Sequence, residues 1–266
     1  MTVIGFGSVR SCGVTTTVAA LAAVWPDERR RVVVELDPSG GTLAASCGLR
    51  VAPGLVSLAT ASRRRMEPDA IWAHSQQLPC GGAVVVGPPS ASQAQRALKL
   101  MTGSVVQFAD VDADVLADCG RLDPTSAARD VFDGAEVRVL AARPQLPDLH
   151  HLAAWLDDAP PKAARPIVVL TGGGPYPPEE IRAALGVEVA AAMPHDPAGV
   201  ARLAETLNTR TINRTALFRA ARSLATTIVE HLTPQLDTLS SDEDTGETPD
   251  AAQPESAEPV PEDARS

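Results

Sequence analysis

The chain has 266 residues, 44% of them hydrophobic, so it can bury one large core but would be cramped as two full domains. Its formal net charge is −10, but residues 240–266 contain nine acids and one base, which leaves −2 for residues 1–239. A nearly neutral folded part argues against nucleic acid as a partner, although clustered arginines could still contact a phosphate locally.

The four cysteines lie far apart and form no CxxC pair, which argues against a zinc site and for reduced, buried thiols. No apolar run reaches the ~18 residues of a membrane span, and the first residues lack the features of a signal peptide. We therefore expect a cytoplasmic protein whose contact with a membrane is at most peripheral.

A loop of small residues joins an apolar run at 3–6 to an apolar helical run at 18–24. This arrangement suits phosphate binding, because the first N–H groups of a helix lack internal partners. The motif G-x-x-x-x-G-K-[ST] would begin at Ser8, but only Gly13 and Thr15 fit it. The loop is either a degenerate phosphate-binding loop or an ordinary turn capped by threonine.

Apolar runs separated by helical stretches continue along the chain. Further strands are expected at 31–37, 82–87, 114–118, 137–141, 166–170 and 187–191. Helices are expected at about 42–47, 92–101, 148–157, 178–185, 198–207 and 213–232. This alternation predicts an α/β domain over residues 1–239, with a mostly parallel twisted sheet of about seven strands and helices on both faces.

Two acids follow predicted strands. Asp37 lies at the carboxyl end of the second strand, and Asp118 at the end of the fourth. Ligands of open α/β sheets bind outside these ends. We expect the two carboxylates to lie at the tips of adjacent or next-nearest strands, close to Thr15.

The last predicted helix and the residues that follow it differ in composition. Residues 240–266 are acidic, contain four prolines and no aromatic residue, and are expected to form a disordered tail. That tail either binds partners, aids solubility or is dispensable. The helix at 213–232 has an apolar side that is expected to pack on the sheet rather than to anchor a membrane: Leu217, Phe218, Ala221, Leu224, Ile228 and Leu232.

Taken together, these segments resemble the ParA/MinD family of deviant Walker A P-loop ATPases, and within it the TadZ/CpaE-like branch found beside pilus and secretion machinery. GVTTTVAALA at 13–22 is similar to the family's G-K-T-T-T-x-x-N-L-A, and ELDPSGG at 35–41 to its D-x-D-P-Q-G-N. DVLADCGR at 114–121 resembles its Walker B strand, and MPHDP at 193–197 its P-x-D turn next to adenine. The resemblance spans about residues 2–232.

The resemblance implies ATP and Mg²⁺ as cofactors, a homodimer, and protein partners in a pilus, secretion or partitioning system. It places Asp37 near the attacking water and the magnesium, Asp118 beyond the first magnesium ligands, and Thr15 on the metal. Nucleotide contacts would come from Arg10, Ser11, Cys12, Gly13, Val14, Thr15, Thr16, Pro194 and Asp196. Asp196 is otherwise a simple turn former.

Both family lysines are missing, because Val9 and Val14 occupy their positions. Each would contribute ~1.5–3 kcal/mol, so triphosphate binding should weaken by roughly two to four powers of ten unless Arg10 compensates. Two hypotheses follow: a nucleotide-driven positioning ATPase, and a pseudo-ATPase scaffold that recruits partners with little turnover. Arg121, after the Walker B match, is either a phosphate-sensing residue or a plain surface arginine.

Overall fold

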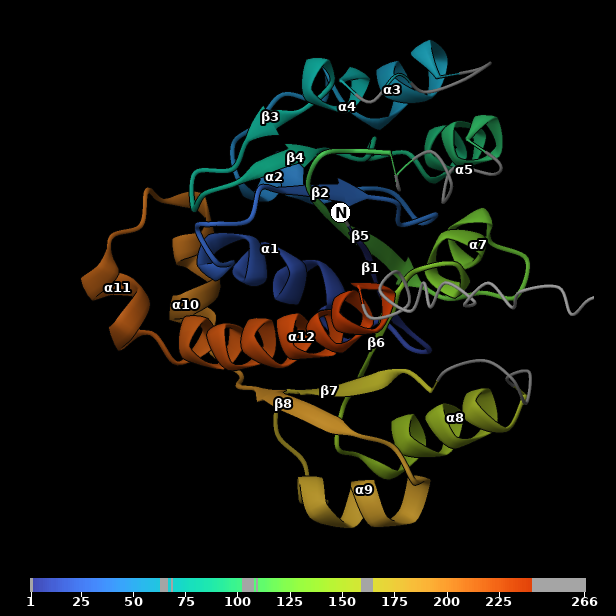
Figure 1. Cartoon of the computed structure of the whole chain (residues 1–266), viewed down its shortest axis with the longest axis vertical. Coiled ribbons are helices and arrows are strands. Elements are labelled where there is room, and N and C mark those ends of the chain that lie inside the picture. The colour runs from blue at the N-terminus through green and yellow to red at the C-terminus, as the bar shows by residue number, and fades with distance from the viewer. Residues whose placement is uncertain are drawn as a thin grey trace, which may run out of the picture. The chain divides into compact units, whose positions relative to one another are not determined.

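A computed structural model describes residues 2–62, 67, 69–101, 108, 110–158 and 165–240. Residues 1–232 form one compact unit, and residues 233–266 are grouped separately. The last helix continues to Ser240, and the disordered tail predicted for the end of the chain lies, from residue 241 onward, outside the described residues. The compact unit has the predicted α/β architecture (Figure 1).

Within the described residues, one mixed sheet of eight strands has the order β3-β4-β2-β5-β1-β6-β7-β8. The strands are β1 Thr2–Ser8, β2 Arg31–Glu35, β3 Gln76–Gln77, β4 Ala83–Val85, β5 Asp114–Arg121, β6 Val137–Ala142, β7 Ile167–Thr171 and β8 Val189–Met193. All seven predicted strands are confirmed, with ends shifted by up to a few residues. The additional strand, β3, pairs antiparallel with β4 at the edge. Its two glutamines have no apolar pattern that could have predicted it.

Helices cover both faces of the sheet, as predicted (Figure 1). They are α1 Val14–Val24, α2 Leu43–Ser46, α3 Leu55–Ala61, α4 Ala70–Ala73, α5 Ala91–Leu100, α7 Ala127–Asp133, α8 Leu146–Asp157, α9 Pro178–Leu185, α10 Pro197–Ala201, α11 Thr209–Arg214 and α12 Ala216–Ser240, with a 3₁₀ turn at Arg202–Ala204. Helices α3, α4 and α7 have no counterpart among the helices expected from the sequence.

Successive side chains along each strand point to opposite faces of the sheet and so contribute to two apolar layers. In β2, Val32 and Val34 point into the layer under α3, α5, α7 and α8, whereas Val33 points into the layer under α1 and α12. The predicted apolar side of α12 lies in the second layer, where its six residues are at most 4% exposed. The expectation that this helix packs on the sheet is therefore confirmed.

The segment after β8 differs from the prediction. Two long helices were expected, but the chain forms α10, a 3₁₀ turn, α11 and α12. Side-chain caps explain the breaks: Asn208 Oδ1 accepts a hydrogen bond from Thr211 N at 2.9 Å and begins α11. Asp196 caps α10 through Gly199 N at 2.9 Å and also accepts from Leu217 N in the first turn of α12 at 3.1 Å.

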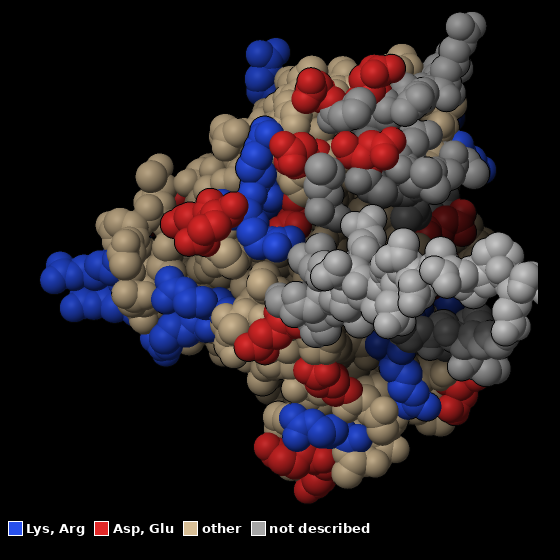
Figure 2. Space-filling view, in the orientation of Figure 1, with Lys and Arg blue, Asp and Glu red and all other residues tan. Residues whose placement is uncertain are grey.

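Charges are unevenly distributed over the compact unit. Exposed arginines gather on α11 and the first turns of α12, at the left of Figure 2: Arg210, Arg214, Arg219 and Arg222. A nearly neutral net charge therefore hides a local basic surface. Among the described residues, no helix combines the length and the apolarity that crossing a membrane requires.

Candidate functional site

The loop after β1 is built as an anion site would be. Gly13 has φ +89°, in the left-handed region that favours glycine, and precedes the first residue of α1. Within the described part of the chain, no side chain caps the amino end of this helix. Thr17 N and Thr17 Oγ1 both donate to Gly13 O at 3.0 Å. The first amides of α1 are therefore not used by a threonine cap, and they remain available to an anion.

A pocket of about 460 Å³ lies beside this loop. The carboxyl ends of β6, β7 and β8 bring the turn at 194–197 to the loop at 12–17, although the two are far apart in sequence. Five of the residues predicted to contact nucleotide line the pocket: Cys12, Gly13, Thr16, Pro194 and Asp196. Arg143 and Thr171 also line it, and sequence reasoning missed them because the strand order that brings them there was not known.

Asp196 already has partners inside the protein. Both of its carboxylate oxygens accept backbone N–H groups, one from α10 and one from α12. The hydrogen bond from Gly199 is the main cause of its lowered pKa, with smaller effects from Leu217, Ala216 and Arg219. This carboxylate therefore shapes the turn beside the pocket, and a ligand would meet the turn rather than a free carboxylate.

The predicted pair of strand-end acids lies together. Strands β2 and β5 are adjacent and parallel, and Glu35 is in register with Asp118. Asp118 is fully buried; its Oδ1 accepts a hydrogen bond from Gly120 N at 3.0 Å, whereas its Oδ2 has no partner among the described residues. The pKa of Asp118 is raised to about 7: burial is the main cause, the charges of Glu35 and Asp37 add to the rise, and a nearby Thr15 hydroxyl opposes it. Thr15, Asp37 and Asp118 thus form one group of side chains.

Asp37 follows β2 by two residues and is half-buried. Its Oδ1 accepts a hydrogen bond from Ser39 N at 2.7 Å. Its carboxyl group also lies against the backbone of Gly120, where φ is +57° and an added Cβ would come within 2.2 Å of Asp37 Cγ. Glycine at position 120 therefore permits the close approach of this acid to the end of β5.

Glu35 holds the loop that carries Asp37, a role that was not predicted from the sequence. Its Oε1 accepts hydrogen bonds from Thr42 N at 2.6 Å and Leu43 N at 3.0 Å, and its Oε2 from Gly87 N at 2.8 Å. Burial raises its pKa, and the three backbone donors oppose that rise. An acid inside an apolar strand was the available signal, because such a group needs buried donors.

The side chains around Asp118 could supply only some of the ligands of a Mg²⁺ ion. Among the described residues, no three His, Cys, Asp or Glu side chains gather as a ready metal site. Mg²⁺ usually keeps several waters and takes one or two protein ligands together with phosphate oxygens. The Thr15 hydroxyl, the unpartnered Asp118 Oδ2 and the half-buried Asp37 are compatible with that kind of binding.

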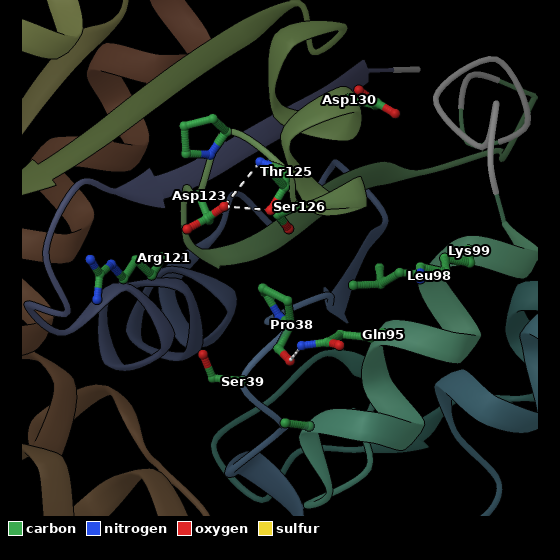
Figure 3. A pocket seen from close by; sticks show the side chains of 12 residues that line it. Pro38, Ser39, Gln95, Leu98, Lys99, Arg121, Asp123, Thr125, Ser126 and Asp130 are labelled. Atoms are coloured by element: carbon green, nitrogen blue, oxygen red, sulfur yellow. Dashed lines mark hydrogen bonds between the residues drawn. The ribbon is translucent and has the colours of Figure 1, made fainter.

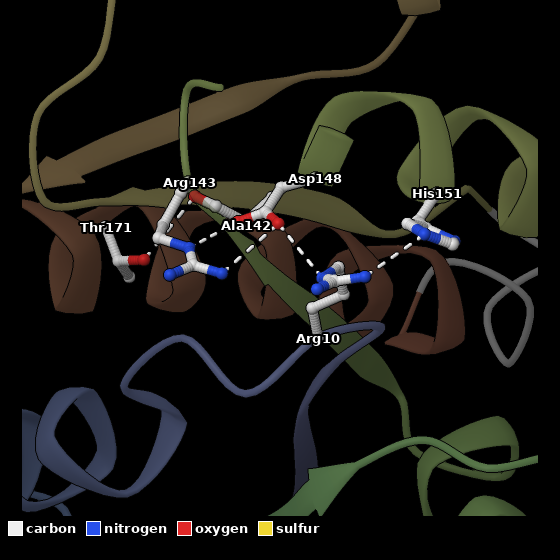
Figure 4. A network of polar contacts seen from close by, with 6 residues as sticks. All are labelled: Arg10, Ala142, Arg143, Asp148, His151 and Thr171. Carbon is white, nitrogen blue, oxygen red and sulfur yellow. Dashed lines mark hydrogen bonds and ion pairs between the residues drawn. The ribbon is translucent and has the colours of Figure 1, made fainter. Parts of the chain in front are cut away.

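The side chains of three residues predicted to contact nucleotide do not line this pocket. Arg10 Nε pairs with Asp148 Oδ1 at 3.3 Å, and Arg10 Nη1 contacts His151 at 3.2 Å, so its side chain is directed to α8 (Figure 4). Val14 is 5% exposed and belongs to the apolar layer under α1. Ser11 is exposed and is not among the residues that line the pocket.

The fold matches solved structures closely. A ParA family ATPase from Chlorobium tepidum TLS has a TM-score of 0.69 and 15% identity, over 84% of this chain and 97% of that chain. The septum site-determining protein MinD from Pyrococcus horikoshii OT3, complexed with Mg-ADP, has a TM-score of 0.65 and 18% identity, over 92% and 99%. MinD in the MinC:MinD complex of Aquifex aeolicus has a TM-score of 0.62 and 12% identity, over 86% and 96%.

These neighbours are ParA and MinD proteins, and the chain has their fold. By sequence, no protein-family model and no curated protein matches it.

Proposed function

We propose that the protein is a ParA/MinD-like, nucleotide-dependent protein that acts in intracellular positioning or assembly and binds Mg²⁺ and ATP weakly at a degenerate loop. The observation that carries this proposal lies at the carboxyl ends of the parallel strands, where the uncapped amino end of α1 lies beside Thr15, Asp37 and Asp118. The pocket beside the loop adds room for a base and ribose. The similar protein from Pyrococcus horikoshii is a complex with Mg-ADP.

In this proposal each residue has a defined task. The first amides of α1 bind the phosphate oxygens, and Thr15 binds the metal, with Asp118 and Asp37 acting through water. A bound Mg²⁺ would neutralise charge on the phosphates. Asp37 would also orient the attacking water, which makes Asp37 and Asp118 the candidate catalytic residues.

The second hypothesis is a pseudo-ATPase scaffold that recruits protein partners without hydrolysis. Two observations favour it. Val14 packs in the apolar layer where the family has lysine, and Arg10 is paired with Asp148 instead of pointing to the loop. Hydrolysis should suffer more than binding from the loss of cations, because charge builds on the phosphoryl oxygens in the transition state.

Calorimetric titration with ATP, with and without Mg²⁺, tests the binding. We expect weak binding that requires Mg²⁺, because the metal must carry most of the neutralisation when both lysines are absent. Release of inorganic phosphate measured on the same protein separates the two hypotheses. If no ATP binds in the presence of Mg²⁺, the nucleotide-binding proposal is wrong and only the scaffold hypothesis remains.

We further propose a homodimer whose partners belong to a pilus, secretion or partitioning system. The comparison that supports protein partners is the MinD protein solved in complex with MinC. Light scattering after size exclusion should give twice the monomer mass, and a larger dimer fraction with Mg²⁺ and ATP than without them. A monomer under both conditions would contradict the dimer.

A further inference from the structure

The proposed phosphate site has three acids and too few cations. Glu35, Asp37 and Asp118 lie together at the ends of β2 and β5, and the charges of the first two raise the pKa of the third. Arg10 lies in the loop after β1, and Arg143 lines the pocket beside that loop. Both arginines pair with the same residue, the buried Asp148 (Figure 4). A triphosphate would add further negative charge to this site. Another positive group is needed there.

An extra residue in β5 brings such a group to the loop. Along β1, Phe6 and Ser8 are two positions apart, but their partners on β5, Asp118 and Arg121, are three apart. This is a β-bulge, a feature that often redirects a side chain beside a functional site. Gly120 accommodates it with φ +57°. As a result, Arg121 pairs with Ser8, the first residue of the loop, and Leu122 N donates to Ser8 O at 2.9 Å.

The Arg121 side chain is free to bind an anion. It is exposed, and within the described residues no hydrogen bond or ion pair of its guanidinium is found. The nearest acid along the chain, Asp123, is engaged by Thr125, whose N and Oγ1 donate to Asp123 Oδ1 at 2.9 and 2.7 Å. These two hydrogen bonds are the main causes of the lowered pKa of Asp123, and the charge of Arg121 adds only a smaller effect.

Arg121 lies at one side of a groove of about 850 Å³ that continues from the loop of Asp37. Figure 3 shows it beside Ser39, with its guanidinium directed away from Asp123. Lys99, the other cation that lines this groove, comes from α5 on the opposite side of the view (Figure 3). Of these two cations, Arg121 is therefore the one joined through the sheet to the phosphate-binding loop.

We propose that Arg121 supplies positive charge to the phosphate chain of a nucleoside triphosphate, in place of the two missing loop lysines. The inference rests on the proposed nucleotide binding. Arginine suits this task because its planar guanidinium can form two parallel hydrogen bonds to one phosphate. The bulge and the strand pairing explain why it can act from β5, whereas the family's lysines would act from the loop itself.

The test compares MgATP and adenosine binding by calorimetry in the wild type, Arg121→Ala, Arg121→Lys and the matched control Lys99→Ala. Arg121→Ala should weaken MgATP binding by roughly tenfold to a hundredfold, the range of one charge-assisted hydrogen bond, and leave adenosine binding unchanged. Arg121→Lys should retain part of the affinity, and Lys99→Ala all of it. Thermal unfolding without ligand should be nearly the same for all four proteins, because both positions line the surface.

Each other outcome is decisive. If Arg121→Ala binds MgATP as the wild type does, this inference is wrong while the proposed nucleotide binding stands. An equal loss for adenosine and MgATP would also overturn it, because the effect would then not depend on phosphate. If the wild type does not bind MgATP, the proposed function fails and this inference fails with it.

Discussion

We expect Asp118→Asn to stabilise the protein at pH 8 by about 2–4 kcal/mol in the absence of nucleotide. The carboxyl is fully buried with one oxygen unpartnered, and burial raises its pKa from 3.8 to about 7. Each pKa unit corresponds to about 1.4 kcal/mol, so holding this group ionised in the fold costs roughly 4 kcal/mol at most. Asparagine keeps the acceptor for Gly120 N and removes the buried charge.

The pH dependence has a defined sign. The folded protein holds the Asp118 proton up to a higher pH than the unfolded chain does, so stability from this group is greatest below the unfolded pKa of about 4. It is lost as pH rises from about 4 through about 7. The difference between wild type and Asp118→Asn should therefore be largest at pH 8 and less than half as large at pH 5. Thermal unfolding at both pH values measures it, with an expected shift on the order of 5–10 °C at pH 8.

Asp114→Asn is the matched control, because Asp114 is a buried acid on the same strand with a full set of partners. Its Oδ2 accepts from Trp25 Nε1 at 2.9 Å, and its two oxygens accept from Arg29 Nε at 2.5 Å and Arg29 Nη2 at 2.7 Å. Removing one partner of such a pair leaves a poorly compensated charge, so we expect a loss of about 2–4 kcal/mol. Equal destabilisation by both variants would show that the buried charge of Asp118 does not lower the free energy of unfolding.

These two acids illustrate how far sequence reasoning reaches. The apolar runs predicted seven strands and their alternation with helices, because each run has to be buried on both faces of a parallel sheet. Asp37 and Asp118 were placed at one edge because parallel strands share that edge. Asp114, the first residue of the predicted strand at 114–118, gave no signal of its partners, because Trp25 and Arg29 reach it only through the packing of α1 and the following loop.

The parts that sequence reasoning missed depend on long-range pairing. The bulge that aligns Arg121 with Ser8 forms between two strands that are more than a hundred residues apart in the sequence. No local sequence pattern therefore predicts it. Arg10 shows the opposite error. Its place in the loop suggested a phosphate contact, but Asp148 on α8 binds it, and the position of α8 relative to the loop follows from the strand order. Glu35 was visible as an acid within a strand, and its three backbone donors were not.

We expect Val14→Lys to strengthen MgATP binding by roughly tenfold to a hundredfold and to lower the stability of the free protein. The position is the first residue of α1, directly after Gly13, so a lysine amine extends toward the anion that the helix amides attract. Val14 is 5% exposed, and the longer stem has to cover the same apolar neighbours while its amine reaches water. Overpacking of this kind costs about 1–3 kcal/mol.

Val14→Met separates the two effects, because methionine has a stem of similar length and no charge. We expect it to lower the melting temperature about as much as lysine does and to leave MgATP affinity unchanged. Calorimetry with ATP and Mg²⁺, together with thermal unfolding of the free proteins, measures both quantities. If methionine and lysine change the affinity equally, the gain comes from repacking of the loop and not from charge.

The double variant Val14→Lys/Arg121→Ala joins this prediction to the proposed role of Arg121. Because the expected gain and the expected loss are of similar size, the double variant should bind MgATP about as tightly as the wild type if the two positions act independently. A larger gain from lysine in the Arg121→Ala protein than in the wild type would mean that a single positive group satisfies most of the need of the phosphates. Additive effects would mean that the two positions act on different phosphate oxygens, so that both charges would be needed for full affinity. A lysine that fails to restore any binding would place the lost interaction away from the amino end of α1.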